Sequence, residues 1–144
     1  MTKISKLIIS NFKAFSERIE IPFDGKNILI FGENGSGKSS IFYALHVLLQ
    51  SSEKSSEKIQ NYFDLSHKEK LINIFSSQNP EDSFIEIQLK EKNYEQTSEQ
   101  FKSYTISYNE ITTNTTKVIK EINQASDFIN YKVLMEFHTR NNYL

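Results

Sequence analysis

The stretch Gly32-Glu33-Asn34-Gly35-Ser36-Gly37-Lys38-Ser39 has the spacing Gly-x-x-x-x-Gly-Lys-Ser, which occurs once in the chain. The apolar run Asn27–Phe31 precedes it and predicts a short strand that is buried on both faces. Apolar residues at helical spacing follow it, and they are Ile41, Ala44, Leu45, Leu48 and Leu49. A strand, this glycine-rich loop and a helix in direct succession predict a phosphate-binding loop.

The composition of the loop suits a triphosphate. Glycine reaches positive φ values and lets backbone N–H groups approach phosphate closely, while the N-terminus of the following helix attracts anions. We expect Lys38 to neutralise the β- and γ-phosphates, Ser39 to ligate Mg²⁺, and Ser40 to reach the α-phosphate. The predicted ligands are therefore ATP and Mg²⁺. The predicted contacts are Gly32, Glu33, Asn34, Gly35, Ser36, Gly37, Lys38, Ser39 and Ser40. The alternative is a glycine-rich turn with an accidental lysine.

The other segments predict one α/β (α+β) unit over residues 1–144, with a mixed β-sheet around the loop and its helix. Period-two or apolar patterns predict strands over Lys3–Phe12, Glu17–Phe23, Phe84–Leu89 and Phe101–Tyr108. Asp24-Gly25 predicts a turn of the hairpin kind. Helices are expected within Ile59–Phe75, over Val118–Ile122, and after an N-cap at Ser126 with Ile129 to Phe137 on its apolar face. The serine- and lysine-rich residues 51–58 predict an exposed loop.

Composition excludes several classes of site. The chain has 144 residues, a formal net charge of -1 and no cysteine, so neither a disulfide nor a thiolate zinc site is possible. The three histidines are too far apart in sequence to suggest a metal site. No apolar run reaches the length of a membrane span and no signal-peptide pattern is present, which favours a cytoplasmic location without a membrane partner. Basic residues crowd the start of the chain and form either a local basic face or a solvated strand face; they are Lys3, Lys6, Lys13, Arg18 and Lys26.

The N-terminal third resembles a known group of ATPases. Asn11-Phe12-Lys13-x-Phe15 ends the first predicted strand, and Ser40-Ile41-x-x-Ala44-Leu45 continues the loop. Over residues 3–49 this strongly resembles the N-terminal ATPase lobe of the SMC, Rad50 and RecF group of ABC-type, phosphate-loop ATPases. The resemblance implies that ATP lies between two such lobes. It also implies that Lys13, where family members often carry arginine, lies near the nucleotide; a solvated turn residue is the alternative.

The sequence departs from this group in the part that hydrolyses ATP. The group uses an Asp-Glu pair at the end of a later strand, and neither this pair nor a Leu-Ser-Gly-Gly signature is present. Val133–Glu136 is an apolar run that ends in an acid, but it lacks the aspartate and has a helical pattern. The Q-loop glutamine is missing too, and His138 is only a candidate for its position. We therefore expect no catalytic residue in this chain, and whether it is an enzyme by itself stays open.

Three functions remain after this comparison. The first is the ATP- and Mg²⁺-binding lobe of an SMC-like ATPase in DNA repair, DNA maintenance or defence against foreign DNA. It would hydrolyse ATP only with a C-terminal lobe and a second head, on the same chain or another. The second is a non-hydrolysing nucleotide-binding or protein-interaction module. A transporter-type ATP-binding subunit is the weakest, and small GTPases are disfavoured because no Asn-Lys-x-Asp occurs. A DNA partner follows from the resemblance.

Overall fold

The computed structural model describes residues 2–75, 79–91 and 99–127. Its four strands form one sheet in the order β2-β1-β3-β4, with every neighbouring pair antiparallel. The strands are β1 (Thr2–Ser10), β2 (Ile19–Pro22), β3 (Phe84–Glu91) and β4 (Gln100–Ser107). The helices are α1 (Lys38–Gln50), α2 (Ser56–Gln60) and α3 (Lys117–Gln124), with 3-10 turns η1 (Ser51–Glu53), η2 (Asn61–Phe63) and η3 (Pro80–Asp82). No helix in the described ranges is long and apolar enough to span a membrane.

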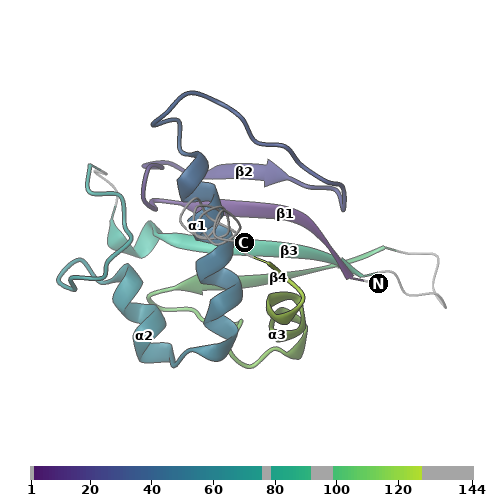
Figure 1. Ribbon diagram of the computed structural model, residues 1–144. Helices are drawn as coiled ribbons and strands as arrows, with labels where there is room; N and C mark the ends of the chain where they lie inside the picture. Colours follow the sequence, from purple (N-terminus) through teal and green to yellow (C-terminus); the bar gives the residue numbers. More distant parts are fainter. Residues whose placement is uncertain (1, 76–78, 92–98, 128–144) are drawn as a thin grey trace, which may run out of the picture.

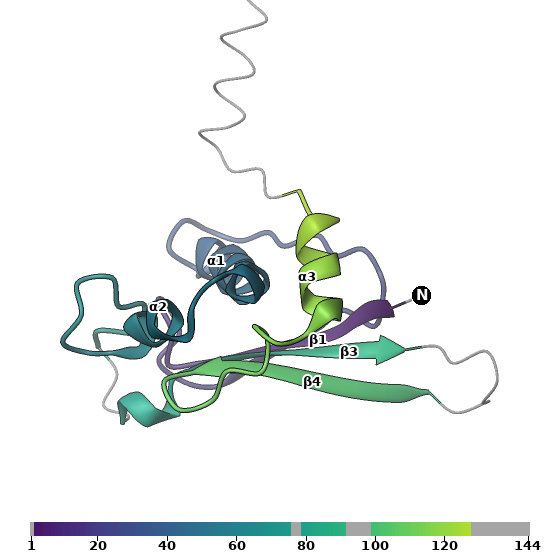
Figure 2. The same ribbon diagram turned by 90° about the horizontal axis from the view of Figure 1, so that it is seen from below.

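The core lies between the sheet and a single layer of helices. Figure 2 shows α1, α2 and α3 on the same side of the sheet. Alternate strand residues point into this space, because successive side chains of a strand face opposite sides. Those that are fully buried are Leu7, Ile9, Ile85, Ile87, Leu89 and Ile106. The helices contribute Ala44, Leu48, Leu49, Ile59 and Ile119, so the helical stripe predicted after the loop packs against the sheet.

Most of the predicted elements are confirmed. The four strands and the helix after the loop occur where their patterns place them, and Val118–Ile122 lies inside α3. The Asp24-Gly25 turn is present, with φ values of 50° and 67°. Its N–H groups donate to the Ser5 and Ile4 carbonyls of β1, and the chain then leaves the sheet.

The expectation of a buried strand over Asn27–Phe31 is wrong for the described structure, and so is the expectation of a mixed sheet. No backbone hydrogen bond joins this segment to another described residue. Figure 1 shows it as a bare connection that arches beyond the β2 edge before α1. Ile28 and Ile30 are 38% and 41% exposed, whereas Leu29 and Phe31 are 85% and 88% exposed. A segment with this composition needs cover on both faces, and the described fold covers one face only in part.

Two further expectations need correction. Residues 55–58 are exposed as expected, but residues 51–58 are not a loop, because η1 and the start of α2 lie there. Ser51 is fully buried and pairs with the Thr113 hydroxyl. The helices expected within Ile59–Phe75 occur only in part: α2 ends and η2 follows in the first residues, and after Phe63 this described range runs through turns and one isolated bridge between Phe12 and Ile72. The helix expected after Ser126, the run Val133–Glu136 and His138 fall outside the described residues.

Candidate nucleotide-binding site

The glycine-rich loop ends at the N-terminus of α1 in a form suited to an anion. Gly35 and Gly37 have φ values of 86° and 95°, which residues with a Cβ rarely adopt. No side chain among the described residues caps α1, and the first turn of this helix contains no acidic residue. Its first N–H groups and the positive end of its dipole are therefore available to a negatively charged ligand. Glu33, Asn34, Gly35 and Ser36 are exposed beside this helix end, and Ser39 is exposed in its first turn.

The Lys38 ammonium lies inside the loop. Its Nζ donates to the Gly32 carbonyl at 2.6 Å and to the Glu33 carbonyl at 2.5 Å, and it lies 3.4 Å from the Ser36 hydroxyl. All three acceptors belong to the loop and carry no net charge. Among the described residues no carboxylate forms an ion pair with this lysine, and its positive charge would attract phosphate.

The turn after β1 packs directly on this loop and on α1. Phe12 and Phe15 exchange backbone hydrogen bonds of 2.8 and 2.9 Å, which closes the turn. The Ala14 N–H donates to the Ser40 hydroxyl at 3.2 Å. The Phe15 ring lies so close to Gly37 that a Cβ added there would approach it to 2.7 Å. The structure therefore brings together the two motifs that the sequence analysis singled out separately.

The structure also shows where the remaining predicted contacts lie. Phe15 brings this turn into contact with the loop, and the Nζ of Lys13 lies 4.4 Å from the centre of the Tyr43 ring in α1. Ser40 is almost completely buried, and its oxygen accepts the Ala14 N–H, which still allows the hydroxyl to donate its proton to a ligand. Sequence reasoning did not identify Tyr43 or Asn73 as part of this region. Their polar groups carry no motif, and only the fold brings them to Lys13.

Known proteins have sequences similar to the part of the chain that contains this region. A family model described as an AAA domain matches residues 6–144. The chain belongs to the AAA domain family. Membership implies a phosphate-loop NTPase and nucleotide binding. The chain is also similar to the chromosome partition protein Smc of Mesomycoplasma hyorhinis, at 42% identity over 60 residues. That alignment covers 42% of this chain and 6% of the length of the Smc protein. The two matches confirm the resemblance to the ATPase lobe of SMC-like proteins.

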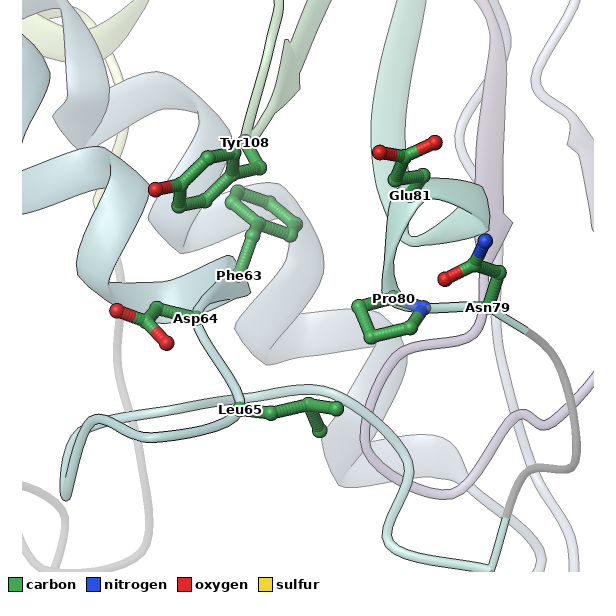
Figure 3. Close-up of a pocket in the computed structure, with 7 residues that line it drawn as sticks. All are labelled: Phe63, Asp64, Leu65, Asn79, Pro80, Glu81 and Tyr108. Carbon is green, nitrogen blue, oxygen red and sulfur yellow. The ribbon is translucent and has the colours of Figure 1, made fainter.

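A separate hollow of about 280 Å³ in the AAA domain has the wrong chemistry for phosphate. Figure 3 shows Phe63, Leu65, Pro80 and Tyr108 around it, together with the carboxylates of Asp64 and Glu81. The Ser66 hydroxyl and N–H donate to Asp64, and these bonds lower the pKa of its carboxyl. The carboxyl is thus ionised at neutral pH, and like charge would repel a triphosphate. None of the loop residues lines this hollow.

Two of the basic residues near the start of the chain are paired with a carboxylate. Lys6 and Arg18 both pair with Glu20, at 2.6 and 2.5 Å. The side-chain hydrogen bonds from Lys6 and Arg18 lower the pKa of the Glu20 carboxyl. At Lys6 and Arg18 the pairing favours a solvated strand face over a local basic face. Within the described residues, no group of three or more His, Asp or Glu side chains is arranged to hold a metal ion.

Proposed function

We propose that the chain binds ATP with Mg²⁺ in the Gly32–Ser39 loop and acts as the nucleotide-binding lobe of an SMC-like ATPase. The observation that carries this proposal is the loop itself, with Lys38 folded into it at an uncapped helix N-terminus. A triphosphate supplies the negative charge that this arrangement lacks. The family match and the similarity to Smc support the same function.

Each residue has a binding role in this proposal. The backbone N–H groups of residues 33–39 hold the phosphates, and Lys38 neutralises the β- and γ-phosphates. The Ser39 hydroxyl ligates Mg²⁺, which spreads the charge of the triphosphate. Ser40 donates its remaining proton toward the α-phosphate, and Lys13 adds a second positive charge. We assign the activation of water to no residue of this chain.

Hydrolysis then depends on a complementary C-terminal lobe and a second head, in the same chain or another. The bare segment Asn27–Phe31 supports this dependence, because its free backbone groups and its exposed Leu29 and Phe31 suit a strand added from a partner sheet. The same surface also supports the second candidate, a non-hydrolysing module that pairs with another lobe. Turnover measured with and without the C-terminal lobe distinguishes the two.

The proposed function extends to DNA maintenance. This extension rests on the similarity to a protein named for chromosome partition. If the lobe touches DNA directly, Lys3→Glu and Lys26→Glu should weaken binding and reduce its salt dependence. If the affinity for DNA and its salt dependence are unchanged, these residues do not contact DNA directly.

A fluorescent ATP analogue, titrated with and without Mg²⁺, tests nucleotide binding. Lys38→Ala should abolish binding, and Ser39→Ala should remove most of the Mg²⁺ dependence. Lys117→Ala is the matched control, because this lysine is exposed on α3 and pairs with Glu121 at 3.5 Å. Equal binding by the wild type and Lys38→Ala would overturn the proposal.

A further inference from the structure

Three consecutive residues of the turn after β1 contact three positions of the loop and α1 in register. Phe15 packs on Gly37, the Ala14 N–H donates to Ser40, and Lys13 lies over Tyr43. Positions 37, 40 and 43 are spaced by three and so share one side of the helix start. The turn therefore runs antiparallel to the first turns of α1 and ends with Lys13 at Tyr43.

The backbone of Lys13 is fixed in an unusual conformation. Its φ is 47°, in the left-handed region that side chains with a Cβ disfavour. Its N–H donates to the Leu71 carbonyl at 2.7 Å, and its carbonyl accepts the Asn73 side-chain amide at 2.5 Å.

Asn73 is buried and braces the same turn in two further ways. Its N–H donates to the Asn11 carbonyl at 3.3 Å, and its Oδ1 accepts the Phe75 N–H at 2.9 Å. Asn11 also has a φ of 47°. The Asn73 side chain thus links the turn to residues 73–75 and stabilises a backbone that sends the Lys13 side chain toward α1.

Tyr43 attracts the Lys13 ammonium without neutralising it. A ring centre at 4.4 Å is within cation–π range, and the ring carries no net charge. Among the described residues, no carboxylate pairs with Lys13. Tyr43 follows Ser39 by four residues and lies one helical turn below it on the same side of α1. The ammonium is consequently held one turn from the loop with its full charge available to an anion.

We propose that Tyr43 and Asn73 are positioning residues that hold the Lys13 ammonium beside the phosphate loop for the triphosphate. Tyr43 fixes the end of the side chain, and Asn73 fixes the backbone from which it starts. The inference rests on the proposed nucleotide binding, and it assigns roles to two residues that lie outside every motif in the sequence.

A double-mutant cycle on the full chain tests this inference, with the dissociation constant for the fluorescent ATP analogue and Mg²⁺ as the readout. Tyr43→Leu should weaken binding about two- to fivefold, the range of a solvent-accessible cation–π contact, while Tyr43→Phe should keep wild-type affinity. In a Lys13→Met background, Tyr43→Leu should change nothing. A general structural effect would instead weaken binding equally in both backgrounds.

Asn73→Ala should follow the same pattern, with weaker binding only when Lys13 is present. If this variant fails to fold, as judged by its circular dichroism melt, the Tyr43→Leu comparison still tests the inference, because Tyr43 is exposed. Unchanged or tighter binding by Tyr43→Leu, or equal loss in both backgrounds, would overturn the inference while leaving nucleotide binding intact. A wild-type chain that binds no nucleotide would overturn the proposed function and the inference with it.

Discussion

Replacement of Phe31 by serine should leave the stability of this lobe nearly unchanged, although a phenylalanine in a predicted core strand normally contributes strongly. The ring is 88% exposed, so only the remaining 12% of its surface is buried. Full burial of a phenylalanine side chain stabilises by up to about 3 kcal/mol, and 12% of that is about 0.4 kcal/mol. The expected loss in unfolding free energy is therefore about 0.4 kcal/mol.

The same arithmetic predicts the effect on pairing with a complementary lobe. If that lobe covers the exposed 88% of the ring, Phe31→Ser forfeits about 2.6 kcal/mol of burial. This corresponds to roughly an 80-fold loss in affinity. Stability of the lobe and affinity for its partner should thus separate in one variant.

Urea unfolding followed by circular dichroism measures the first effect, with Leu48→Ala as the buried control. Leu48 is fully buried between α1 and the sheet, so its truncation should cost about 2–5 kcal/mol. Backbone amides of residues 28–31 should also exchange with solvent at nearly unprotected rates. A loss above about 1 kcal/mol for Phe31→Ser, or strong protection of these amides, would refute the claim that the lobe leaves this segment uncovered.

Three other predictions concern the glycines of the loop, a buried pair of hydroxyl groups and a histidine of α1. Gly35→Ala should cost about 1 kcal/mol through its positive φ alone, whereas Gly37→Ala should cost at least about 1 kcal/mol more in urea unfolding, because its Cβ would also meet an aromatic ring at 2.7 Å. Thr113→Val should cost about 1 kcal/mol by removing its bond to Ser51, and less in a Ser51→Ala background; additive losses would argue against this pairing. Burial, helped by the charge of a nearby lysine, lowers the pKa of His46 below its usual 6.5. As the pH falls, His46 therefore binds a proton in the unfolded chain before it does so in the folded chain. Thermal stability should fall as pH drops below about 6.5, and His46→Gln should flatten that fall.

Local patterns in the sequence sufficed for most of the sheet and for the helix after the loop. β3 alternates apolar and polar residues in the way that a half-buried strand requires, and β1 carries an aliphatic run at Leu7, Ile8 and Ile9. The helix after Gly37 has its apolar residues at helical spacing and buries them. These features depend on residues within a few positions of one another, so the local sequence pattern is enough to predict them.

Patterns failed where the outcome depends on distant partners. Ser51 belongs to a polar, low-complexity stretch, yet it is buried because Thr113 supplies a hydroxyl from far along the chain. Asn27–Phe31 has the composition of a central strand, but no described strand lies beside it to accept its backbone hydrogen bonds. Apolarity indicates that a segment needs cover, and it does not indicate which element provides that cover.

The sequence by itself determined the helix after the glycine-rich loop and the resemblance to SMC-like ATPases, and it predicted that the loop binds phosphate, because all three depend on spacing within short segments. Only the tertiary structure decided that the turn around Lys13 packs on α1, with Tyr43 beneath the ammonium and Asn73 bracing the backbone. Thirty residues separate Lys13 from Tyr43 in sequence, and another thirty separate Tyr43 from Asn73. Contacts between positions so far apart arise from the packing of the folded chain, which no local pattern encodes.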